Sequence, residues 1–277
     1  MMNNLHPTII YFAAAAILGL CPGRRRGYLV LAASVLGLWA VHLLEAGVPT
    51  QTALLDLELS PLRVDKLSKV FGYIFALNSI AAALFALRLQ DARQQLAGLF
   101  YIGSALGAAF AGDMLTLYVF WEMMAVSSTF LILARQTRTA LEAGYRYILV
   151  HLFGGLVMLV GIIIHFNATG SLEFAAFVPG SAGSWWILIG ILVNASAVPL
   201  SSWLSDSYPE ATVTGGVILS AYTTKTAVYA LLRGFPGWEV LIVVGCVMTV
   251  YGIIYALLEN DMRRILAYSI TNQVGFT

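Results

Sequence analysis

Charged residues are scarce in this 277-residue chain, in which aspartate, glutamate, lysine and arginine together make up only 10% of the sequence. A soluble domain carries about 25% charged residues, so water cannot surround most of this chain. Hydrophobic residues make up 60% of it, and the mean hydropathy is +0.84. The formal net charge of +1 argues against a nucleic-acid partner, which would require a strongly basic surface. The composition therefore predicts a protein that lies mostly in a lipid bilayer.

Cysteine is nearly absent as well, since the chain holds only Cys21 and Cys246. Two cysteines so far apart make neither a disulfide framework nor a zinc site, and because both lie in apolar runs we expect buried thiols. No group of histidine, cysteine and carboxylate residues has the spacing of metal ligands. We therefore expect no metal and no cofactor. The chain has no catalytic motif of its own, and whether it is a subunit of an enzyme stays open.

Apolar runs recur along the whole chain, and a membrane span needs about 20 mainly apolar residues. The candidate spans are 8–22, 27–46, 68–88, 95–111, 114–134, 143–166, 184–199, 213–233 and 238–258. A further helix begins near Ile265. We predict an all-α, polytopic transmembrane helix bundle of about nine to ten spans, with no hydrophilic domain and no long linker.

Arginine residues gather in alternate loops between these spans. The basic loops contain Arg24, Arg25, Arg26, Arg88, Arg93, Arg135, Arg138, Arg146, Arg263 and Arg264. Because basic loops are retained on the cytoplasmic side of a membrane, this pattern places the N-terminus outside. We expect a multi-pass protein of a bacterial inner membrane.

Two ionisable residues lie where lipid would surround them. Glu122 is near the middle of the predicted span 114–134, and Lys225 is near the middle of the span 213–233. A charge at the bilayer centre costs at least about 2.5 kcal/mol on the mildest scales. One interpretation is a structural ion pair that determines how the helices pack. We favour a proton-carrying role, because both groups can change protonation state when they are partly desolvated.

Two histidines lie on the predicted span 143–166, His151 inside it and His165 near its outer end. A histidine on an apolar helix is often a hydrogen-bonded core residue, but imidazole also accepts and returns protons near pH 7. Both interpretations stay open for His151, and we place His165 at the membrane interface.

The seventh predicted span ends at Pro199, and the polar stretch 201–216 follows, interrupted by Pro209 and two glycines. Transporters place discontinuous helices at their ion sites, although a plain interfacial loop would have a similar sequence. Hydroxyl side chains accompany both charges, which are Ser127, Ser128 and Thr129 after Glu122, and Thr223 and Thr224 beside Lys225. Such hydroxyls can carry a water chain, but each more commonly bonds a carbonyl of its own helix.

Five sequence motifs, in order, form a pattern shared by one protein family. They are LRVDKLS at 62–68, AGDMLTLYVFWEMM at 111–124, PLSSWLSDSYPEA at 199–211, TKTAVYALLR at 224–233 and ENDMRRILAYS at 259–269. Together they resemble the antiporter-like subunits of respiratory complex I and of Mrp-type cation/proton antiporters. Within that family, the amino-acid sequence at 208–214 and 223–229 is most similar to that of the D subunit of Mrp antiporters.

The resemblance assigns roles to the two buried charges. Glu122 matches the family's span-five glutamate and Lys225 matches its central span-eight lysine. The family's span-seven lysine, which pairs with the glutamate, is replaced here by Asn194, which cannot carry a proton as a cation. Either Lys225, His151 or Arg146 then compensates Glu122, or the first half-channel is rewired or inactive.

The resemblance also implies an architecture. Family members have about fourteen spans that include two inverted repeats of about five helices, with span seven broken. This implies N-terminal helices at 1–94, a first repeat with a proton half-channel at 95–237 and the start of a second repeat at 238–277. We expect Pro199, Asp206 and Arg146 to be structural or gating residues. The end of the chain inside span ten suggests either a fragment or a split subunit.

Three hypotheses about function follow. The first is a membrane subunit of a multisubunit monovalent cation (sodium)/proton antiporter that translocates protons through Glu122, Lys225, His151 and Asn194. The second is an antiporter-like subunit of a redox-driven complex, either NADH-quinone oxidoreductase or a membrane-bound hydrogenase. The third is a structural subunit that conducts nothing. In each case the expected partners are other subunits of the complex, the lipid bilayer, and protons with or without sodium. We expect no nucleic-acid partner.

Overall fold

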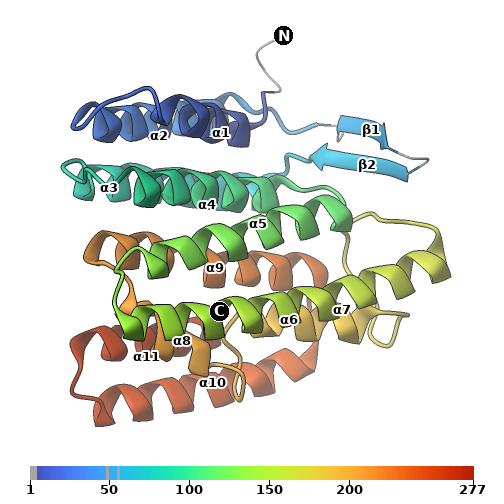
Figure 1. The fold of residues 1–277 in the computed structure, drawn as a ribbon. Helices are drawn as coiled ribbons and strands as arrows, with labels where there is room; N and C mark the ends of the chain where they lie inside the picture. The colour runs from blue at the N-terminus through green and yellow to red at the C-terminus, as the bar shows by residue number, and fades with distance from the viewer. Residues whose placement is uncertain (1–4, 48–49, 55–56) are drawn as a thin grey trace. The chain divides into compact units, whose positions relative to one another are not determined.

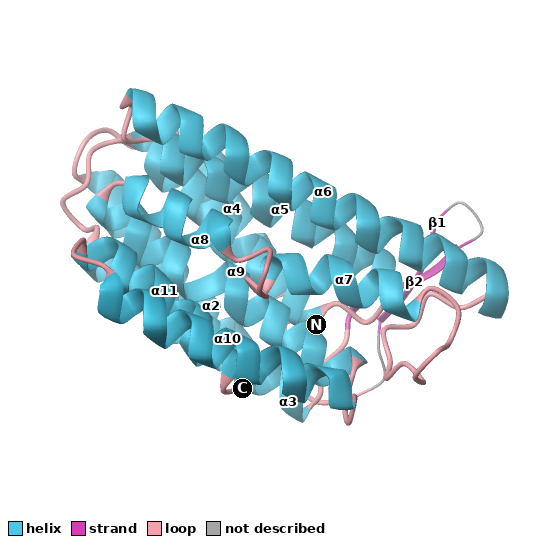
Figure 2. Cartoon of the chain, turned by 90° about the horizontal axis from the view of Figure 1, so that it is seen from below, coloured by secondary structure: helices cyan, strands magenta, loops and turns pink. Residues whose placement is uncertain are grey.

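Helices make up most of the computed structural model, which describes residues 5–47, 50–54 and 57–277. Figure 2 shows these helices joined by loops, together with one short β-hairpin. The α-helices are α1 Pro7–Leu18, α2 Arg25–Leu43, α3 Lys66–Phe85, α4 Ala92–Phe110, α5 Met114–Leu133, α6 Arg138–Thr169, α7 Ser184–Asn194, α8 Ser202–Ser207, α9 Val213–Gly234, α10 Glu239–Leu258 and α11 Met262–Gly275. The 3₁₀ helix η1 spans Tyr208–Glu210, and the strands are β1 Thr50–Leu54 and β2 Leu57–Leu62.

Every predicted span coincides with a helix, which confirms the all-α, polytopic class. Within the described residues, five helices are long and apolar enough to cross a membrane, namely α2, α3, α5, α6 and α10. Two shorter apolar helices, α1 and α7, accompany them. The longest, α6, extends past both ends of the predicted span 143–166. Thr137 caps its first turn, its hydroxyl accepting a hydrogen bond from the Ala140 N–H at 3.1 Å, and Gly170 ends the helix in the left-handed conformation.

One compact unit of the chain consists of Met1–Leu131 and Leu172–Phe174. In it α1 packs on α2 and α4, and α3 packs on α2 and α4 (blue to green in Figure 1). Two hydrogen bonds tie α1 to this core: the Thr8 hydroxyl donates to the Gly103 carbonyl at 2.9 Å, and the Tyr11 and Ser79 hydroxyls are 2.8 Å apart. Because lipid cannot satisfy a buried hydroxyl, such pairs determine how these apolar helices face one another.

The β-hairpin was not predicted. β1 and β2 pair antiparallel, with Thr52 opposite Leu59 and Ala53 opposite Glu58. The alternation of Leu57, Glu58 and Leu59 is the period-two pattern of a strand, but it covers only a few residues between two long apolar runs. In Figure 1 the hairpin lies beside the ends of the helices of its unit.

The second unit consists of Ile132–Ser171 and Ala175–Thr277 and contains α6 to α11. In it α6 packs on α7, α10 packs on α11, and α9 contacts α7. Glycines allow the backbones of α6 and α7 to approach closely. A Cβ atom on Gly190 would lie 2.7 Å from the Gly154 carbonyl oxygen, and one on Gly161 would lie 2.6 Å from the Ile187 nitrogen. Small residues at such contacts are typical of helix pairs in membranes.

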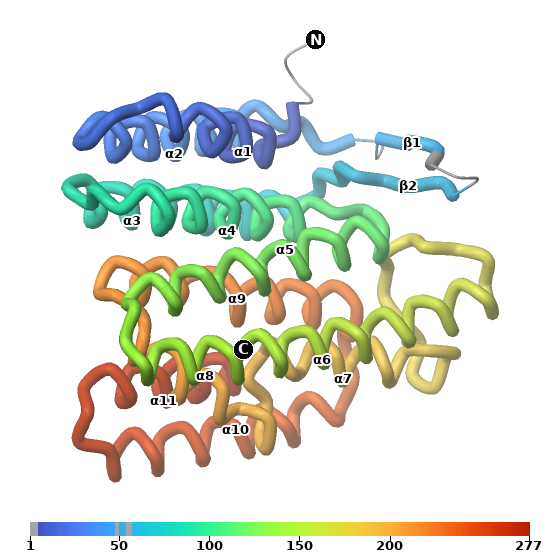
Figure 3. The backbone as a smooth tube through the Cα atoms, in the orientation of Figure 1, coloured from blue at the N-terminus to red at the C-terminus, as the bar shows by residue number. Residues whose placement is uncertain are grey.

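The seventh predicted span is wrong at its C-terminal end. α7 ends at Asn194 instead of Pro199, and the chain turns out of the helix until α8 begins at Ser202 (Figure 3). Pro199 has no N–H to continue the ladder, and its ring excludes the helical conformation from the preceding residue. Ser196 makes the turn with a positive φ of 62°, buried and hydrogen-bonded to the Thr271 hydroxyl at 3.0 Å. Span seven is therefore interrupted, as the resemblance implied.

The expectation of buried thiols is wrong for Cys246, which is exposed, and Cys21 is only half-buried. Cys246 lies on α10, of whose most apolar stretch only 11% is buried within the protein. An apolar sequence predicts burial either in protein or in lipid, and here α10 turns most of its surface outward.

Candidate functional site

Asp113 positions the helix that carries Glu122. Its buried carboxylate accepts hydrogen bonds from the Thr116 N–H at 2.7 Å and from the Ser60 N–H at 2.8 Å. A carboxylate that accepts a hydrogen bond from the backbone N–H three residues further along the chain is a typical helix N-cap. It anchors the start of α5 to strand β2, and Glu122 then follows near the middle of the helix.

Glu122 is partly buried, and its Oε1 atom is inaccessible and has no hydrogen-bond partner among the described residues. The hydroxyl groups that follow Glu122 along α5 donate to backbone carbonyls of the same helix. Ser127 donates to the Met123 carbonyl at 2.6 Å, and Thr129 donates to the Ala125 carbonyl at 2.7 Å. These hydroxyls satisfy their own helix, so no continuous hydroxyl chain follows Glu122 along α5.

Lys225 lies on α9, whose first turn is capped by Thr212. The Lys225 side chain is mostly sheltered and folds back along its helix, where its Nζ donates to the Ser220 carbonyl at 2.8 Å. Within the described part of the chain no carboxylate forms an ion pair with it. A charged ammonium thus lies inside a helix bundle with a backbone dipole as its bonded partner.

His151 and Asn194 meet one helical turn beyond the glycine contact of α6 and α7. Both side chains are buried, at 1% and 4% exposure. The Asn194 amide faces the imidazole, but no bond of normal hydrogen-bond geometry joins them. At normal hydrogen-bond geometry, neither ring nitrogen of His151 nor the Asn194 Oδ1 has a partner among the described residues, although the two side chains interact with each other.

Two aromatic side chains flank the His151 ring. The Tyr147 ring lies 4.1 Å away between centroids, and the Trp203 indole lies 4.5 Å away in an edge-to-face arrangement. The indole Nε1 donates to the Val193 carbonyl at 2.9 Å, which holds α8 against the end of α7. The sequence motif around Trp203 was recognised, yet nothing in the spacing showed that the indole covers His151.

An ion pair stands at the surface above this cluster. Arg146 of α6 binds Asp206 of α8 through two hydrogen bonds, Nε to Oδ2 at 2.7 Å and Nη2 to Oδ1 at 3.1 Å. Both side chains also line a depression of about 580 Å³, together with Leu149, Val150, Ser202, Trp203, Ser205 and Arg264. The ion pair thus joins the two helices that carry the His151 ring and its Trp203 neighbour.

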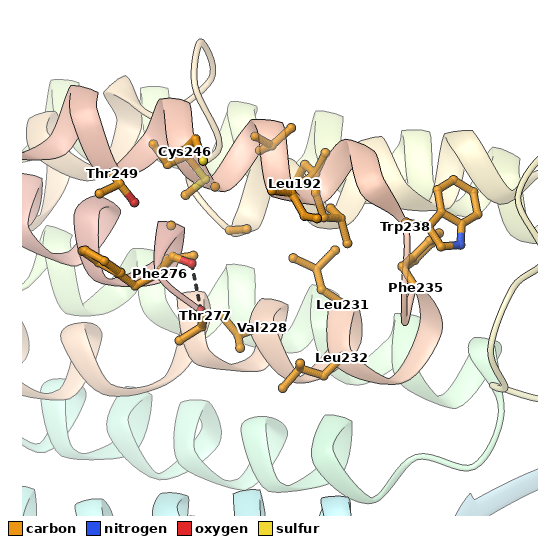
Figure 4. Close-up of a pocket in the computed structure, with 18 of the residues that line it drawn as sticks. Leu192, Val228, Leu231, Leu232, Phe235, Trp238, Cys246, Thr249, Phe276 and Thr277 are labelled. Atoms are coloured by element: carbon orange, nitrogen blue, oxygen red, sulfur yellow. Dashed lines mark hydrogen bonds between the residues drawn. The ribbon is translucent and has the colours of Figure 1, made fainter.

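A second hollow, of about 800 Å³, lies among α7, α9, α10 and α11 (Figure 4). It is lined almost wholly by apolar side chains, and Cys246 is the one ionisable side chain that lines it. Among the described residues no group of three or more histidine, cysteine or acidic side chains is placed to hold a metal ion.

The predicted site residues thus fall into separate settings. His151, Asn194, Arg146 and Asp206 gather where α6, α7 and α8 meet, and Pro199 lies in the turn between α7 and α8. Lys225 lies on α9 of the same unit, and Glu122 belongs to the first unit with surroundings of its own. His165 is half-exposed, with its Nδ1 3.3 Å from the Ala182 carbonyl oxygen.

Known proteins resemble the chain in sequence and in fold. Residues 111–277 match the family described as "NADH:quinone oxidoreductase/Mrp antiporter, TM". NADH-quinone oxidoreductase subunit M of Escherichia coli is 29% identical over 83% of this chain and 53% of its own length. A putative antiporter subunit, mnhA2 of Staphylococcus aureus, is 30% identical over 84% of this chain and 32% of its own length. The chain therefore spans about half or less of these relatives.

A solved structure has the same fold. A chain of the Mrp complex from a Dietzia species superposes with a TM-score of 0.77 over 98% of this chain and 53% of its own length, at 24% sequence identity.

Proposed function

Because the chain belongs to the NADH:quinone oxidoreductase/Mrp antiporter transmembrane family, we propose that it works as a subunit of a multisubunit monovalent cation (sodium)/proton antiporter. It is an antiporter-like membrane subunit by family. We infer that its own contribution is to carry protons, with other subunits of the complex as its partners. A bacterial inner membrane with the N-terminus outside is the location that the basic loops favour.

The observation that carries this proposal is the pair of ionisable side chains without ionic partners. The Glu122 Oε1 is buried and unbonded, and the Lys225 ammonium bonds only a backbone carbonyl among the described residues. A purely structural charge inside a membrane is normally paired. Unpaired groups of opposite sign are suited instead to bind and release protons.

We propose the following division of roles. Lys225 takes up the proton, and Glu122 acts as an electrostatic switch that raises or lowers the lysine's affinity for it. His151 and Asn194 extend the route on α6 and α7, where Asn194 replaces the lysine that other family members carry. The Asn194 Oδ1 cannot hold a proton as a cation, so His151 is the titratable group at this position.

Three further residues are proposed to be structural or gating residues. Arg146 and Asp206 join α6 to α8 by their ion pair, and Pro199 interrupts the helix between α7 and α8. The divisions at 94/95 and 237/238 remain our proposal for the N-terminal helices, the first repeat and the start of the second.

The test is sodium-driven proton movement in membrane vesicles that contain the assembled complex. Lys225→Ala and Glu122→Gln are expected each to reduce transport to background, because each removes a group that changes charge. Lys66→Ala and Glu142→Gln are matched controls, since both alter exposed side chains of the same types. Wild-type-like transport in Lys225→Ala and Glu122→Gln would overturn the proposal.

A second candidate is a subunit of a redox-driven complex, an NADH-quinone oxidoreductase or a membrane-bound hydrogenase. It is favoured by the Escherichia coli relative, which is named as a subunit of NADH-quinone oxidoreductase. The complex purified through this chain distinguishes the two. Co-purifying flavin and iron–sulfur subunits would indicate the redox complex. A third outcome would indicate a structural subunit: the complex needs Lys225 in order to assemble, but the assembled complex conducts no protons through this chain.

A further inference from the structure

We propose that exposed arginines at one end of the first unit form a binding surface for the headgroups of anionic phospholipids. We call this surface the arginine patch, and it consists of Arg24, Arg25, Arg88 and Arg93. It lies at the end of helices α1 to α4 that we expect to face the cytoplasm. The inference requires only that the chain lies in a membrane, and it does not depend on proton transport.

The arginine patch is brought together by two loops that contact each other, one joining α1 to α2 and the other joining α3 to α4. Arg26, in the first turn of α2, links them. Its Nε donates to the Cys21 carbonyl at 2.7 Å, and its Nη1 donates to the Gln90 carbonyl at 3.2 Å. The same turn lies directly against the second loop, where a Cβ atom on Gly27 would clash with the Leu87 carbonyl group. The exposed arginines beside these contacts therefore share one end of the unit.

The charge of the arginine patch is not balanced by the chain. All four side chains are exposed, and within the described residues no carboxylate forms an ion pair with them. Asp91 is the one acidic residue in the segments 19–31 and 84–96. Its carboxylate caps α4, accepting a hydrogen bond from the Arg93 backbone N–H at 2.9 Å. Together with Arg26, five arginines therefore lie beside a single carboxylate.

The second unit treats its basic helix ends differently. Five arginines and five acidic residues lie there, namely Arg135, Arg138, Arg146, Arg263, Arg264, Glu142, Asp206, Glu210, Glu259 and Asp261. Four of these arginines pair with carboxylates at distances of 2.7 to 3.8 Å. Arg263 donates instead to the Pro209 and Ala211 carbonyls, both at 3.0 Å. The first unit thus presents a net positive surface that the second does not, and such a surface is suited to an anionic ligand.

Exposed apolar side chains beside the arginines indicate that the ligand is a lipid. Tyr28 lies four residues after Arg24 and is 62% exposed, and Leu96 lies three residues after Arg93 and is 39% exposed. Residues three or four apart lie on the same face of a helix. Both arginines therefore have an apolar surface one turn further into the membrane, where the acyl chains of a bound lipid would lie.

The chemistry of the two parts matches a phospholipid. A guanidinium group binds phosphate oxygens through parallel hydrogen bonds, and clusters of basic residues next to membrane helices attract anionic lipids. A soluble anion would use the arginines alone. An acidic protein segment would match the arginines but not the apolar side chains one turn away. A phospholipid with a net negative headgroup satisfies both at once.

The lipid preference of the purified full chain tests the proposal. Phosphatidylglycerol and phosphatidylcholine with identical acyl chains are titrated onto the chain in detergent, and bound lipid is counted by native mass spectrometry. One basic residue near a membrane surface changes the affinity for anionic lipid by about fivefold. We therefore expect phosphatidylglycerol to bind at least about fivefold more tightly than phosphatidylcholine. Equal affinities would overturn the proposal.

Substitutions locate the preference. Arg24→Gln and Arg93→Gln are each expected to weaken phosphatidylglycerol binding about fivefold, whereas Arg24→Lys keeps the charge and should retain most of it. Arg138→Gln is the matched control, because it removes an exposed arginine that Glu142 already pairs at 3.0 Å. Thermal unfolding without lipid checks that each variant is folded, and Arg88→Gln serves in place of a variant that is not. An equal loss in Arg138→Gln would overturn the assignment to the arginine patch.

A partner protein is the alternative occupant, and the same titration on the complex purified through this chain distinguishes it. A preference for phosphatidylglycerol that the complex retains, and that Arg93→Gln weakens there, supports the lipid. A preference seen in the chain alone but lost in the complex would mean that a partner subunit covers the arginine patch, and it would overturn the lipid. Because no transport is measured, a chain that prefers phosphatidylglycerol but moves no protons would support this inference while rejecting the proposed function.

Discussion

Charged side chains near the helix ends and charged side chains in the helix interiors differ in whether they form ion pairs. Near the ends of α5, α6 and α11, arginines and carboxylates pair at 3.0 Å for Arg138–Glu142, 3.3 Å for Arg135–Glu210, 2.7 Å for Arg146–Asp206 and 3.8 Å for Arg264–Glu259. In the interiors, Glu122 and Lys225 have no ionic partner among the described residues.

This difference is the reverse of what stability alone would produce. Pairing contributes little at an exposed helix end, where water screens the charges, and it contributes most in lipid, where a lone charge is costly. The arrangement is therefore better explained by use than by stability. Interior charges that remain unpaired are free to change protonation state.

The largest expected effect comes from separating α6 from α7, the helices that carry His151 and Asn194. Gly190→Ala would place a Cβ atom 2.6 Å from that of Met158 and 2.7 Å from the Gly154 carbonyl oxygen. Because backbone cannot move aside cheaply, we expect a loss of about 3 kcal/mol in unfolding free energy. Thermal unfolding of the purified chain measures it. Gly216→Ala is the control, with open space around its Cβ, and equal effects of both changes would contradict the close contact.

Removing the interior cation should stabilise the protein. Lys225→Met replaces an unpaired ammonium by an apolar side chain of similar length, so we expect the unfolding free energy to rise by about 2 kcal/mol while transport is lost. Unfolding temperature and proton transport are measured on the same preparation. Lys66→Met, at an exposed position, should change neither. A lower unfolding temperature in Lys225→Met would show that the lysine has a stabilising partner.

The ion pair at the surface should contribute less. Arg146→Gln and Asp206→Asn are each expected to cost under about 1 kcal/mol, and the double variant about the same as either alone, because both side chains are partly exposed to screening water. A double-mutant cycle at low and high salt measures the coupling. A coupling that salt does not weaken would mean that the pair is more deeply buried than its exposure indicates.

The smallest effect is expected at the hydroxyls of α5. Ser127→Ala removes a side chain that bonds the Met123 and Met124 carbonyls of its own helix. We expect stability within about 0.5 kcal/mol of the unaltered chain and unchanged proton transport. A large loss of transport with an intact fold would show that this hydroxyl does carry protons.

Most of the fold could be predicted because the signal is local. An apolar run of sufficient length forms a helix in lipid whatever surrounds it, and each predicted span is a helix in the structure. The predictions missed features that depend on neighbours. The hairpin at Thr50–Leu62 was hidden by its short period-two pattern, and α7 ends earlier than Pro199 because Ser196 turns the chain in a buried position bonded to Thr271.

The candidate site was predictable only as a set of residue types. Glu122 and Lys225 stand out because charge is rare in apolar runs, and His151 and Asn194 stand out as polar residues in the same setting. That the last two face one another could not be read from the sequence, because it depends on the rotation and register of α6 against α7.

By itself, the sequence determined that this protein is a bundle of membrane helices, which helices carry ionisable groups, and to which family it belongs. Hydropathy and motif order are properties of the chain and need no partner. Only the tertiary structure decided which polar groups meet and which remain unbonded. The contact at Gly154 and Gly190 sets the register of α6 on α7 and brings His151 opposite Asn194, and the break after Asn194 lets Trp203 cover the ring.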